Sequence, residues 1–403
     1  MSEESPDQDR RDRERTVIGL MSGTSLDGVD AACCRISHVG SDTDPCGYSV
    51  TVDSFVTRPY DTAFRERLAS VCSDEGTVAD VCELNVALGA VFADAAADAA
   101  HAAGISLDDV DAIGSHGQTI RHVPDPQSLP VGDDALRSTL QIGDGSVLAE
   151  RTGVPTVADF RTADVAVGGH GAPLVPFADL ALLAADDRFR VAQNVGGIAN
   201  CTALPPDPAR DDVAAFDTGP GNMVVDGVVE LVTNGEQTYD RDGELARVGT
   251  VDETLLDECL DDDYFRTTPP KSTGRERFGR AYAREFLERC RSRGLSDEDA
   301  VATATALTAE SIADAYRRFL PRTPDEVILS GGGASNPALV AMLDDAVDAD
   351  VRTVDEYGVG ADAKEAVAFA LLAASALDGV PNNVPSATGA SRPVVLGKRC
   401  PPF

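Results

Sequence analysis

The sequence has very little lysine, no closely spaced cysteine pair and no long apolar run. Lys271, Lys364 and Lys398 are its only lysines, and the other cationic side chains are arginines. None of the nine cysteines forms a CxxC pair and the five histidines are scattered, which argues against a structural zinc site. No stretch approaches the roughly 18 uncharged apolar residues of a membrane span, and the charged start does not resemble a secretory signal. We therefore expect a cytoplasmic protein with reduced cysteines.

Acidic residues outnumber basic ones by 68 to 34, which gives a formal net charge of -34. A chain of this charge repels nucleic acid and anionic membrane surfaces, so neither is an expected partner. The acids are spread along the whole length rather than gathered in one tail. This distribution favours a halophilic protein, in which salt screens the self-repulsion. The alternative is an ordinary acidic enzyme from a GC-rich genome.

The chain is long enough, at 403 residues with 43% hydrophobic residues, for two or three domains with sizeable cores. Residues 1–15 are charged and poor in apolar residues, which predicts a disordered tail. The alternation of strand-like and helix-like segments predicts an α/β domain over residues 16–155 and a second one over 156–403.

Several segments have a clear local prediction. "TVIGLM" and "VDAACCRI" predict the two strands of a hairpin, and Val78 to Ala103 predicts a helix that Gly104 closes. "DVDAIGSHGQTI" predicts a short strand followed by a polar loop, and "VAAFDTGPGN" a loop that leads into a helix. "EVILSGGGASNPALVAMLDDAV" predicts a strand, a glycine loop and a helix with an Asn-Pro start.

Four glycine-rich loops, "MSGTSLDG", "QNVGGIANCT", "FDTGPGN" and "LSGGGASN", are the first functional signal. Glycine lets backbone N–H groups approach an anion closely, and Ser or Thr hydroxyls add donors. One such loop alone is more often a tight turn, but four in one chain favour phosphate binding. None fits G-x-x-x-x-G-K-[ST], and none has G-x-G-x-x-G before a helix, so neither a P-loop nor a dinucleotide fold is indicated.

The motifs together resemble one family. "MSGTSLDGVD", "GSHGQTI", "DFRTADVAVGGHGAPLVP", "QNVGGIAN", "FDTGPGNMVVD", "PPKSTGRERFG" and "LSGGGASNPAL" are similar to those of the anhydro-N-acetylmuramic acid kinases, in the same order along the chain. The resemblance implies the α/β two-domain sugar kinase/Hsp70/actin-like (ribonuclease H-like) fold, with ATP and sugar in the interdomain cleft. It also implies ATP and Mg2+ as cofactors, and suggests a homodimer. In the family's reaction, water opens the 1,6-anhydro ring while O6 of the sugar receives the γ-phosphate.

The resemblance assigns residues to ATP in three groups. The first phosphate loop would be Gly23, Thr24, Ser25, Leu26, Asp27, Gly28, Val29 and Asp30, with Asp27 near the magnesium ion. The second group would be Asn194, Gly196, Gly197, Asp217, Gly219 and Gly221. Gly331, Gly332 and Gly333 would pack against the adenosine.

The resemblance also suggests which residues act on the sugar. We predict Asp164 as the base that activates water, with Asp159 as the second choice, and Glu365 could share that water; an ordinary helix cap or turn acid is the alternative for Asp164. His116, Gln118, Asp144 and Arg161 are the predicted substrate contacts. Each has a plainer alternative: a loop histidine with satisfied hydrogen bonds, a turn residue for Asp144, a surface ion pair for Arg161.

Two observations leave the substrate open. His170 stands where the family pattern has glutamine, and an archaeal halophile would have no muramic acid wall to recycle. The alternatives are a kinase of the same fold that acts on another sugar or anhydrosugar, or a nucleotide-dependent switch without catalysis. The presence of "DFRTAD", "GSHGQT" and "GAPL" argues against the switch.

Overall fold

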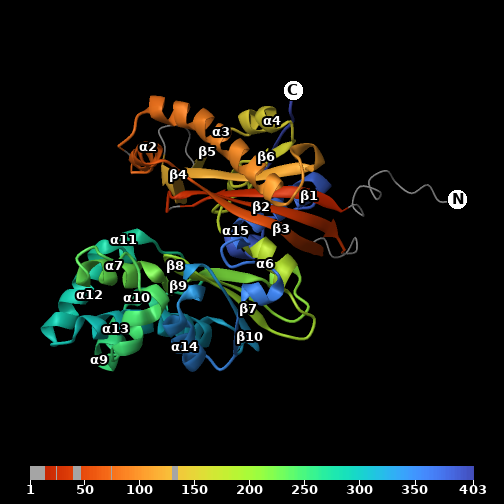
Figure 1. Ribbon diagram of the computed structural model, residues 1–403. Helices are drawn as coiled ribbons and strands as arrows, with labels where there is room; N and C mark the ends of the chain where they lie inside the picture. Colours follow the sequence, from red (N-terminus) through yellow and green to blue (C-terminus); the bar gives the residue numbers. More distant parts are fainter. Residues whose placement is uncertain (1–13, 24, 40–46, 74, 129–134) are drawn as a thin grey trace. The chain divides into compact units, whose positions relative to one another are not determined.

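The computed structural model describes residues 14–403 except 24, 40–46, 74 and 129–134. The chain forms two compact units (Figure 1). Unit 1 comprises residues 1–182, 209–211 and 363–403, and unit 2 comprises residues 183–208 and 212–362. Unit 1 thus continues past residue 155, where the sequence analysis divides the chain, and includes the C-terminal segment.

Unit 1 is built on a seven-stranded sheet in the order β12-β6-β4-β1-β2-β3, with β5 paired to β4. The strands are β1 (Arg15–Ser22), β2 (Gly28–His38), β3 (Tyr48–Pro59), β4 (Ala112–Ser128), β5 (Ala135–Ile142), β6 (Thr156–Ala158) and β12 (Lys398–Cys400). β1, β2 and β3 are antiparallel neighbours, and β4 runs parallel to β1 and to β6.

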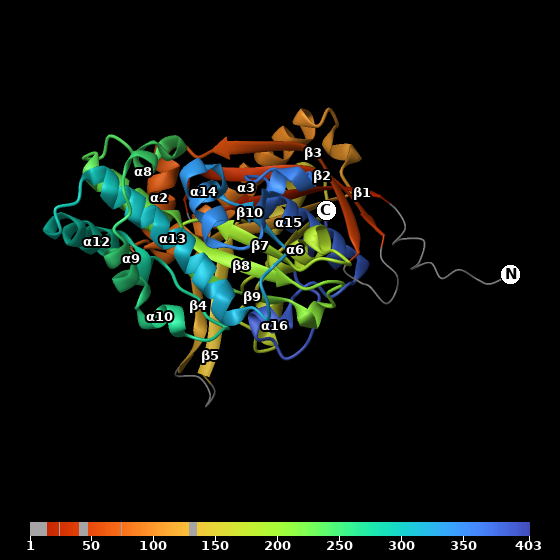
Figure 2. The same cartoon turned by 90° about the horizontal axis from the view of Figure 1, so that it is seen from below.

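Helices cover both faces of this sheet (Figures 1 and 2). The helices of unit 1 are α2 (Thr62–Cys72), α3 (Val78–Ala102), α4 (Gly145–Thr152), α5 (Thr162–Ala166), α6 (Pro176–Leu183), α15 (Lys364–Asp378) and α16 (Pro385–Thr388), with one 3-10 turn, η1 (Leu107–Asp109). Ile18 and Leu20 of β1 point into the core that α3 covers. Because side chains alternate along a strand, Gly19 between them faces α15.

Two glycines allow α15 to lie directly on the sheet. A Cβ on Gly19 would lie 1.8 Å from the Ala366 carbonyl oxygen, and one on Gly114 of β4 would lie 2.1 Å from that of Phe369. Residues 366–376 of α15 are almost all buried alanine, leucine and other small or apolar residues. This close contact fixes the first turn of α15, and with it Glu365, against the sheet.

Unit 2 has a five-stranded sheet in the order β11-β10-β7-β8-β9. Its strands are β7 (Arg190–Val195), β8 (Ile198–Leu204), β9 (Ala214–Pro220), β10 (Glu326–Ser330) and β11 (Asp350–Thr353). Its helices are α7 (Asn222–Val232), α8 (Glu244–Val248), α9 (Glu253–Leu260), α10 (Asp263–Arg266), α11 (Arg275–Phe278), α12 (Arg280–Ser292), α13 (Asp297–Phe319) and α14 (Pro337–Ala346), with 3-10 turns η3 (Arg241–Gly243), η4 (Gly332–Ser335) and η5 (Val354–Tyr357). A further turn, η2 (Arg210–Asp212), lies where the chain passes between the units. Figure 2 shows the long α13, with α9 and α12 beside it.

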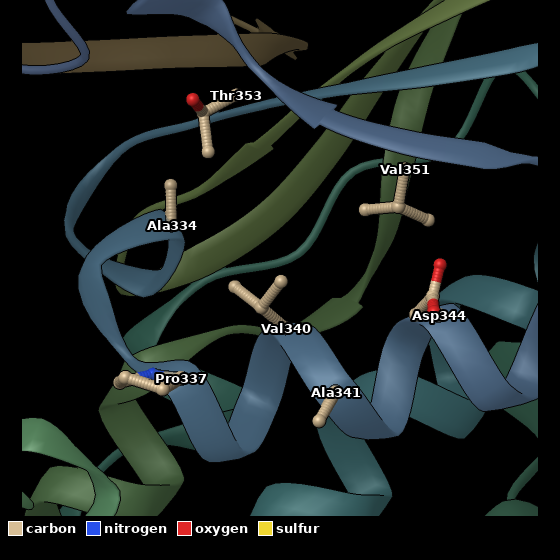
Figure 3. A pocket seen from close by; sticks show the side chains of 7 residues that line it. All are labelled: Ala334, Pro337, Val340, Ala341, Asp344, Val351 and Thr353. Carbon is tan, nitrogen blue, oxygen red and sulfur yellow. The ribbon is translucent and has the colours of Figure 1, made fainter.

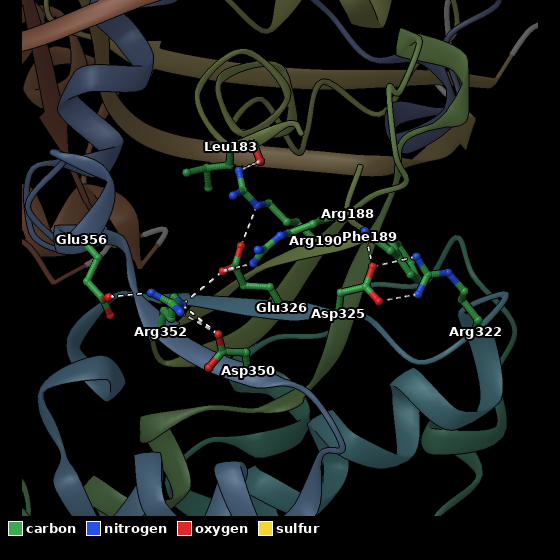
Figure 4. Close-up of polar contacts among 10 residues, drawn as sticks. All are labelled: Leu183, Arg188, Phe189, Arg190, Arg322, Asp325, Glu326, Asp350, Arg352 and Glu356. Carbon is green, nitrogen blue, oxygen red and sulfur yellow. Dashed lines mark hydrogen bonds and ion pairs between the residues drawn. The ribbon is translucent and has the colours of Figure 1, made fainter. Parts of the chain in front are cut away.

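The amino-terminal ends of β7, β10 and β11 meet in a network of charges (Figure 4). Glu326 is buried and lies 2.6 Å from Arg190, 3.1 Å from Arg352 and 3.7 Å from Arg188. Asp350 lies 2.7 Å from the same Arg352. Pairing of this kind offsets the cost of burying a carboxylate, because neighbouring cations replace the water that it has lost.

The local predictions are confirmed for the first hairpin, for the helix that begins at Val78 and for the strand, loop and helix around Gly331. Two predicted loops are wrong. "SHGQT" lies inside β4, which extends to Ser128 because β5 pairs with it. "FDTGP" lies inside β9, where β8 is its partner. In both cases pairing with a neighbouring strand outweighs local turn propensity.

The remaining predictions have mixed outcomes. Most of the predicted tail lies outside the described residues, and Arg15 already belongs to β1. The cysteines whose placement is described are free thiols; Cys33, Cys34 and Cys201 are buried as expected, whereas Cys82 is exposed. None of the helices in the described ranges combines the length and apolar character needed to cross a membrane.

Candidate active site

The hairpin loop between β1 and β2 is the first predicted phosphate loop. Ser25 Oγ donates to Asp27 Oδ1 at 2.7 Å, and both side chains are exposed. Leu26 has a φ of 54°, a left-handed conformation that is uncommon for a branched side chain. A Cβ on Gly28 would lie 2.4 Å from the Arg58 carbonyl oxygen, so the hairpin requires glycine there. Thr24 lies outside the described residues.

The two residues after this loop point to opposite sides of β2. Val29 is fully buried and belongs to the core, so its side chain is not available to a ligand. Asp30 accepts a hydrogen bond of 2.6 Å from Thr57 Oγ1.

The exposed Asp27 carboxylate and Ser25 hydroxyl are suitable ligands for magnesium. Mg2+ prefers oxygen ligands and is commonly held by one or two carboxylates together with substrate phosphates and waters. Among the residues whose placement is described, no group of three or more His, Cys, Asp or Glu side chains could hold a metal ion on its own. The donors therefore fit an ion that arrives with a nucleotide.

In unit 2, the turn between β7 and β8 carries Gly196 and Gly197 and contacts the start of α7. The Asn222 N–H donates to Gly196 O at 2.8 Å, and the Gly221 and Met223 N–H groups donate to Gly197 O at 3.0 and 3.1 Å. A Cβ on Gly221 would lie 2.2 Å from Gly196 O. Since the turn uses these first amides of α7, the helix terminus cannot at the same time offer them to an anion.

The loop after β10 packs on the same turn. Ser330 pairs with Asn194 in the parallel sheet. Gly331 has a φ of 78°, and a Cβ there would lie 2.6 Å from Asn194 Oδ1. A Cβ on Gly333 would lie 2.5 Å from Val195 Cγ1, whereas one on Gly332 would meet only Asn222 Nδ2, at 3.5 Å. The structure thus brings the second group of predicted ATP residues and the adenosine loop together at the carboxyl ends of β7 and β10, the edge at which open α/β sheets bind ligands.

A groove begins where this loop ends (Figure 3). It lies between α14 and the edge strand β11 and has a volume of about 450 Å³. Its lining is mostly apolar: Ala334, Pro337, Val340, Ala341, Val351, Thr353 and Asp344. Ligand sites usually combine apolar walls with several convergent polar groups, and this groove has only Thr353 and Asp344.

Asp217, on edge strand β9, is a half-buried carboxylate of unit 2, as is Asp226 on α7. Its Oδ2 accepts from the Thr273 N–H at 2.8 Å. Burial raises the pKa of the Asp217 carboxyl to about 6, although the Thr273 amide and the nearby Lys271 lower it. A carboxylate with a pKa of this size can accept a proton near neutral pH. Gly219, two residues further on, faces the Ser311 and Phe265 side chains.

Unit 1 holds a second group of predicted residues, centred on Arg161. Its Nε and Nη2 lie 3.2 and 3.0 Å from His116 Nε2, and its Nη1 donates to Gly171 O at 2.8 Å. His116 Nδ1 lies 2.9 Å from the Gly117 carbonyl oxygen, so this nitrogen carries the proton and Nε2 accepts from Arg161. Burial and the Arg161 charge lower the pKa of His116 to about 3. The imidazole is therefore neutral, and it leaves the arginine charge uncompensated.

Among the residues that the structure describes, the polar contacts of Arg161 are with His116 and the Gly171 carbonyl oxygen, and none is with a carboxylate. Burial lowers the pKa of its guanidinium to about 10, and Glu365 raises it. Glu365 is exposed to solvent as a residue. The protein around its carboxyl nevertheless raises the pKa of that group, and Asp30 raises it too, whereas Lys364 and Arg161 lower it. Glu365 is thus close enough to Arg161 and to Asp30 for each of them to influence its charge.

Gln118 belongs to a hydrogen-bonded set that the sequence analysis missed in part. Ser22 Oγ donates to Gln118 Oε1 at 2.6 Å and lies 2.7 Å from the Tyr60 hydroxyl. Ser22 and Gln118 are buried. In the sequence, Ser22 stands directly before the first predicted phosphate loop, and Gln118 lies within "SHGQT". These two positions are the sequence signals that could have linked them.

Asp164 is fully buried, with 0% exposure. Its Oδ1 accepts from Asn383 Nδ2 and Thr388 Oγ1, both at 2.8 Å, and its Oδ2 accepts from the Gly171 N–H at 2.8 Å. This carboxylate ties the turn before Gly171 to the C-terminal segment. The prediction that Asp164 is the base stays a prediction.

The two other predicted acids have structural partners. Asp159 has a φ of 56° and pairs with Lys398. Asp144 is the N-cap of α4: its Oδ1 accepts from the Ser146 and Val147 N–H groups at 2.9 and 3.0 Å. Asn85 Nδ2 donates to its other oxygen at 3.3 Å. This arrangement fits the turn residue that the sequence analysis gave as the alternative for Asp144.

A hairpin with a glycine-containing loop, a second glycine turn packed on a third glycine loop, and two α/β units define the sugar kinase/Hsp70/actin class of proteins. The chain belongs to the anhydro-N-acetylmuramic acid kinase family: the family model described as "Anhydro-N-acetylmuramic acid kinase" matches residues 15–402. The chain is therefore a kinase of this family.

Relatives named anhydro-N-acetylmuramic acid kinase cover the chain almost completely. That of Caldanaerobacter subterraneus subsp. tengcongensis is 45% identical and that of Salinibacter ruber 46%, each over 96% of both chains. That of Gloeobacter violaceus is 47% identical over 94% of this chain and 97% of its own.

Similarity to solved structures of other proteins is low. The activator of 2-hydroxyisocaproyl-CoA dehydratase from Clostridium difficile, with bound ADPNP, matches 89% of this chain and 94% of its own, with a TM-score of 0.42 and 12% identity. The ROK hexokinase from Thermus thermophilus matches 88% of this chain and 97% of its own, with a TM-score of 0.32 and 16% identity. These values carry no conclusion about ligands.

Proposed function

We propose that this protein uses ATP to convert 1,6-anhydro-N-acetylmuramic acid into N-acetylmuramic acid 6-phosphate. The oxygen of a water molecule bonds to the anomeric carbon as the bond from that carbon to O6 breaks. O6 takes the γ-phosphoryl group, ADP leaves, and the proton of the water passes to a carboxylate. Family membership and the arrangement of the glycine loops support this reaction, which would serve the recycling or scavenging of cell-wall sugar.

The observation that carries the substrate choice is Arg161, whose charge has no carboxylate partner among the described residues. Muramic acid differs from other N-acetyl sugars by a lactyl carboxylate, and a planar guanidinium fork suits such a group. His116 holds the fork from one side as a neutral acceptor. Gln118, fixed by Ser22, would contact sugar hydroxyls.

We infer that Asp164 is the base, with Asp159 as the second choice and Glu365 as a second carboxyl that could share the water. Asp164 and Glu365 belong to unit 1, as does Arg161. The Gly171 N–H donates to the Asp164 carboxylate, and the Gly171 carbonyl accepts from Arg161, so one turn links the proposed base to the proposed sugar contact.

The three glycine loops would bind ATP, and Asp27 with Ser25 would contact the Mg2+ that accompanies it. When bound, the ion neutralises charge on the transferring phosphoryl group. The turn amides of Gly196 and Gly197, rather than those at the start of α7, are the proposed donors to phosphate. The protein would work in the cytoplasm, where ATP is available, and as a homodimer. Its acidic surface would be an adaptation to salt, testable as a rise of the unfolding temperature with added salt.

An ADP-release assay in high salt tests the reaction. The three arms contain 1,6-anhydro-N-acetylmuramic acid, the free N-acetyl sugar, or no sugar. We expect turnover with the anhydrosugar, and oxygen from labelled water at the anomeric carbon of the product. Turnover with the free sugar alone would indicate a conventional sugar kinase, and no turnover with either would favour the nucleotide-dependent switch.

Three variants separate the candidate bases. Asp164→Asn should reduce kcat by roughly 100-fold or more, since general base catalysis contributes about 10²–10⁴-fold, and ATP binding should remain. Glu365→Gln should have a smaller effect. If Asp164→Asn keeps its turnover and Asp159→Asn loses it, Asp159 is the base.

A further inference from the structure

Lys364 and Asp179 form a buried ion pair inside unit 1. The Lys364 Nζ lies 2.7 Å from Asp179 Oδ1, and the two residues are only 4% and 2% exposed. Asp179 belongs to α6 and Lys364 is the first residue of α15; the two helices lie side by side (Figures 1 and 2). Apolar residues of similar size often stabilise a protein as well as a buried ion pair does. Stability alone therefore does not explain why a lysine stands here.

A second ion pair holds the other end of the same helix. Arg15 Nη2 lies 2.6 Å from an oxygen of Asp378, the last residue of α15. The two pairs are roughly 20 Å apart along the helix axis, since an α-helix rises about 1.5 Å per residue. They are of the same kind, but only the pair at Lys364 lies beside a proposed functional residue, Glu365.

The carboxyl of Glu365 is surrounded by three charged groups. They are Lys364 of the same helix, Asp30 of β2 and Arg161 at the start of α5. Among these three, Lys364 has the largest effect on the pKa of Glu365, and it lowers that pKa. A charge withdrawn from water acts more strongly on its neighbours than one that solvent screens.

The other strands beneath α15 present uncharged groups to it. β1 faces the helix with Gly19 and β4 with Gly114. The neutral imidazole of His116, also on β4, has its ring centroid 4.8 Å from that of Phe369. β6 consists of the uncharged residues 156–158.

We propose that Lys364 is a positioning residue for Glu365: Asp179 holds its ammonium group inside the protein, where it fixes the first turn of α15 and keeps the neighbouring Glu365 carboxyl ionised. An ionised carboxylate can accept a hydrogen bond or a proton from water, whereas the protonated acid cannot serve as a base. This inference rests on the proposed function, in which Glu365 shares the attacking water with the base.

The double substitution Asp179→Leu/Lys364→Met tests the proposal. It replaces the ion pair by apolar side chains, which buried sites often tolerate, whereas removing one member alone is strongly destabilising. We expect kcat to fall about tenfold, as for a small misplacement of a reacting group, but no further than in Glu365→Gln. The acid limb of the kcat/KM profile should move to higher pH by at least about half a unit, since loss of a nearby cation raises a carboxyl pKa.

A folded double variant with unchanged kcat and an unchanged acid limb would overturn the proposal. If the double variant does not fold, Lys364→Gln takes its place. Glutamine removes the charge and keeps an N–H donor for Asp179, and the same results are expected from it.

Arg15→Met/Asp378→Leu is the matched control. It removes the ion pair at the other end of α15, far from Glu365. Both kcat and the acid limb should stay as in the unsubstituted protein. A shift of the same size in this control would contradict the proposal, because loosening either end of the helix would then be sufficient.

An activity-independent measurement separates this inference from the proposed function. Carbon-13 NMR of glutamate-labelled protein, with the Glu365 signal assigned by its absence in Glu365→Gln, gives the pKa of that carboxyl directly. The proposal predicts a higher Glu365 pKa in Asp179→Leu/Lys364→Met and the original value in the control. An unmoved pKa would overturn it even if kcat fell, because the ion pair would then be structural only. If the unsubstituted protein shows no sugar-dependent turnover, the proposed function fails, and the titration still decides for or against Lys364.

Discussion

Two partly buried arginines, one in each unit, differ in their partners: that of unit 2 pairs with a carboxylate, and that of unit 1 contacts neutral groups among the described residues. Arg190 in unit 2 donates to buried Glu326 at 2.6 Å and to Leu183 O at 3.1 Å, and its guanidinium lies 5.0 Å from the Tyr357 ring centroid. Arg161 in unit 1 contacts only the neutral His116 and a carbonyl oxygen among the described residues. A charge that is withdrawn from water costs stability unless a counter-ion lies close to it. At Arg190 the Glu326 carboxylate offsets this cost. At Arg161 no ion pair among the described residues does so, and we propose an anionic ligand there.

The largest effect is expected from removing the negative charge that pairs with Arg190. Glu326→Gln keeps the shape of the side chain but leaves Arg190 without a counter-charge. Removing one partner of a buried ion pair typically costs about 3–5 kcal/mol, so the free energy of unfolding in denaturant titration should fall by that amount. The KM for ATP and sugar should stay unchanged in the folded protein. A stability loss no greater than that of an exposed pair would show that the network does not compensate the charge.

The next prediction tests whether Arg161 binds the carboxylate of the sugar. Arg161→Met should lower kcat/KM for the anhydromuramic sugar by roughly 10²-fold, because a hydrogen bond to a charged group contributes about 1.5–3 kcal/mol. The same variant should turn over 1,6-anhydro-N-acetylglucosamine, which has no lactyl group, as well as the unsubstituted protein does. Stability should not fall, since the arginine has no carboxylate to lose. Equal losses with both sugars would mean that Arg161 only shapes the fold.

A third prediction concerns the pH dependence of stability and compares Asp217, a partly buried acid, with the two partly buried arginines. Burial raises the Asp217 pKa to about 6, so its contribution to stability depends on pH. A carboxyl whose folded pKa is raised stabilises the protein at low pH and loses this contribution as pH rises through about 6. Melting curves should therefore show Asp217→Asn gaining stability over the unsubstituted protein as pH rises from 4 to 8.

The smallest effect is expected for Asp350, an exposed residue at the edge of the charge network around Glu326. Asp350→Asn removes an exposed carboxylate 2.7 Å from Arg352, and exposed pairs contribute little because solvent and salt screen them. Unfolding measurements should barely distinguish this variant from the parent protein, at low or high salt. A loss comparable to that of Glu326→Gln would mean that the whole cluster, rather than buried Glu326, carries the stability.

The sequence predicts the first hairpin, α3, α14 and the glycine loops because local patterns specify them: alternating apolar residues, an Asn-Pro helix start, glycine where a turn needs it. Its two loop errors, "SHGQT" and "FDTGP", arose where a partner strand from elsewhere in the chain extends β4 or β9. Lys271 was noticeable only as one of three lysines; its aromatic contacts come from residues 7 and 48 positions away.

By itself the sequence determined the family, the order of the glycine loops and the excess of acidic residues, because each depends on residue type and spacing along the chain. Only the tertiary structure decided what surrounds each carboxylate. Asp164, Asp144 and Asp217 look alike in sequence. Burial and hydrogen-bond partners distinguish them: Asp164 is enclosed by donors from the C-terminal segment, Asp144 caps a helix, and Asp217 lies on a sheet edge with a raised pKa. Those surroundings are assembled by distant parts of the chain, so no local pattern contains them.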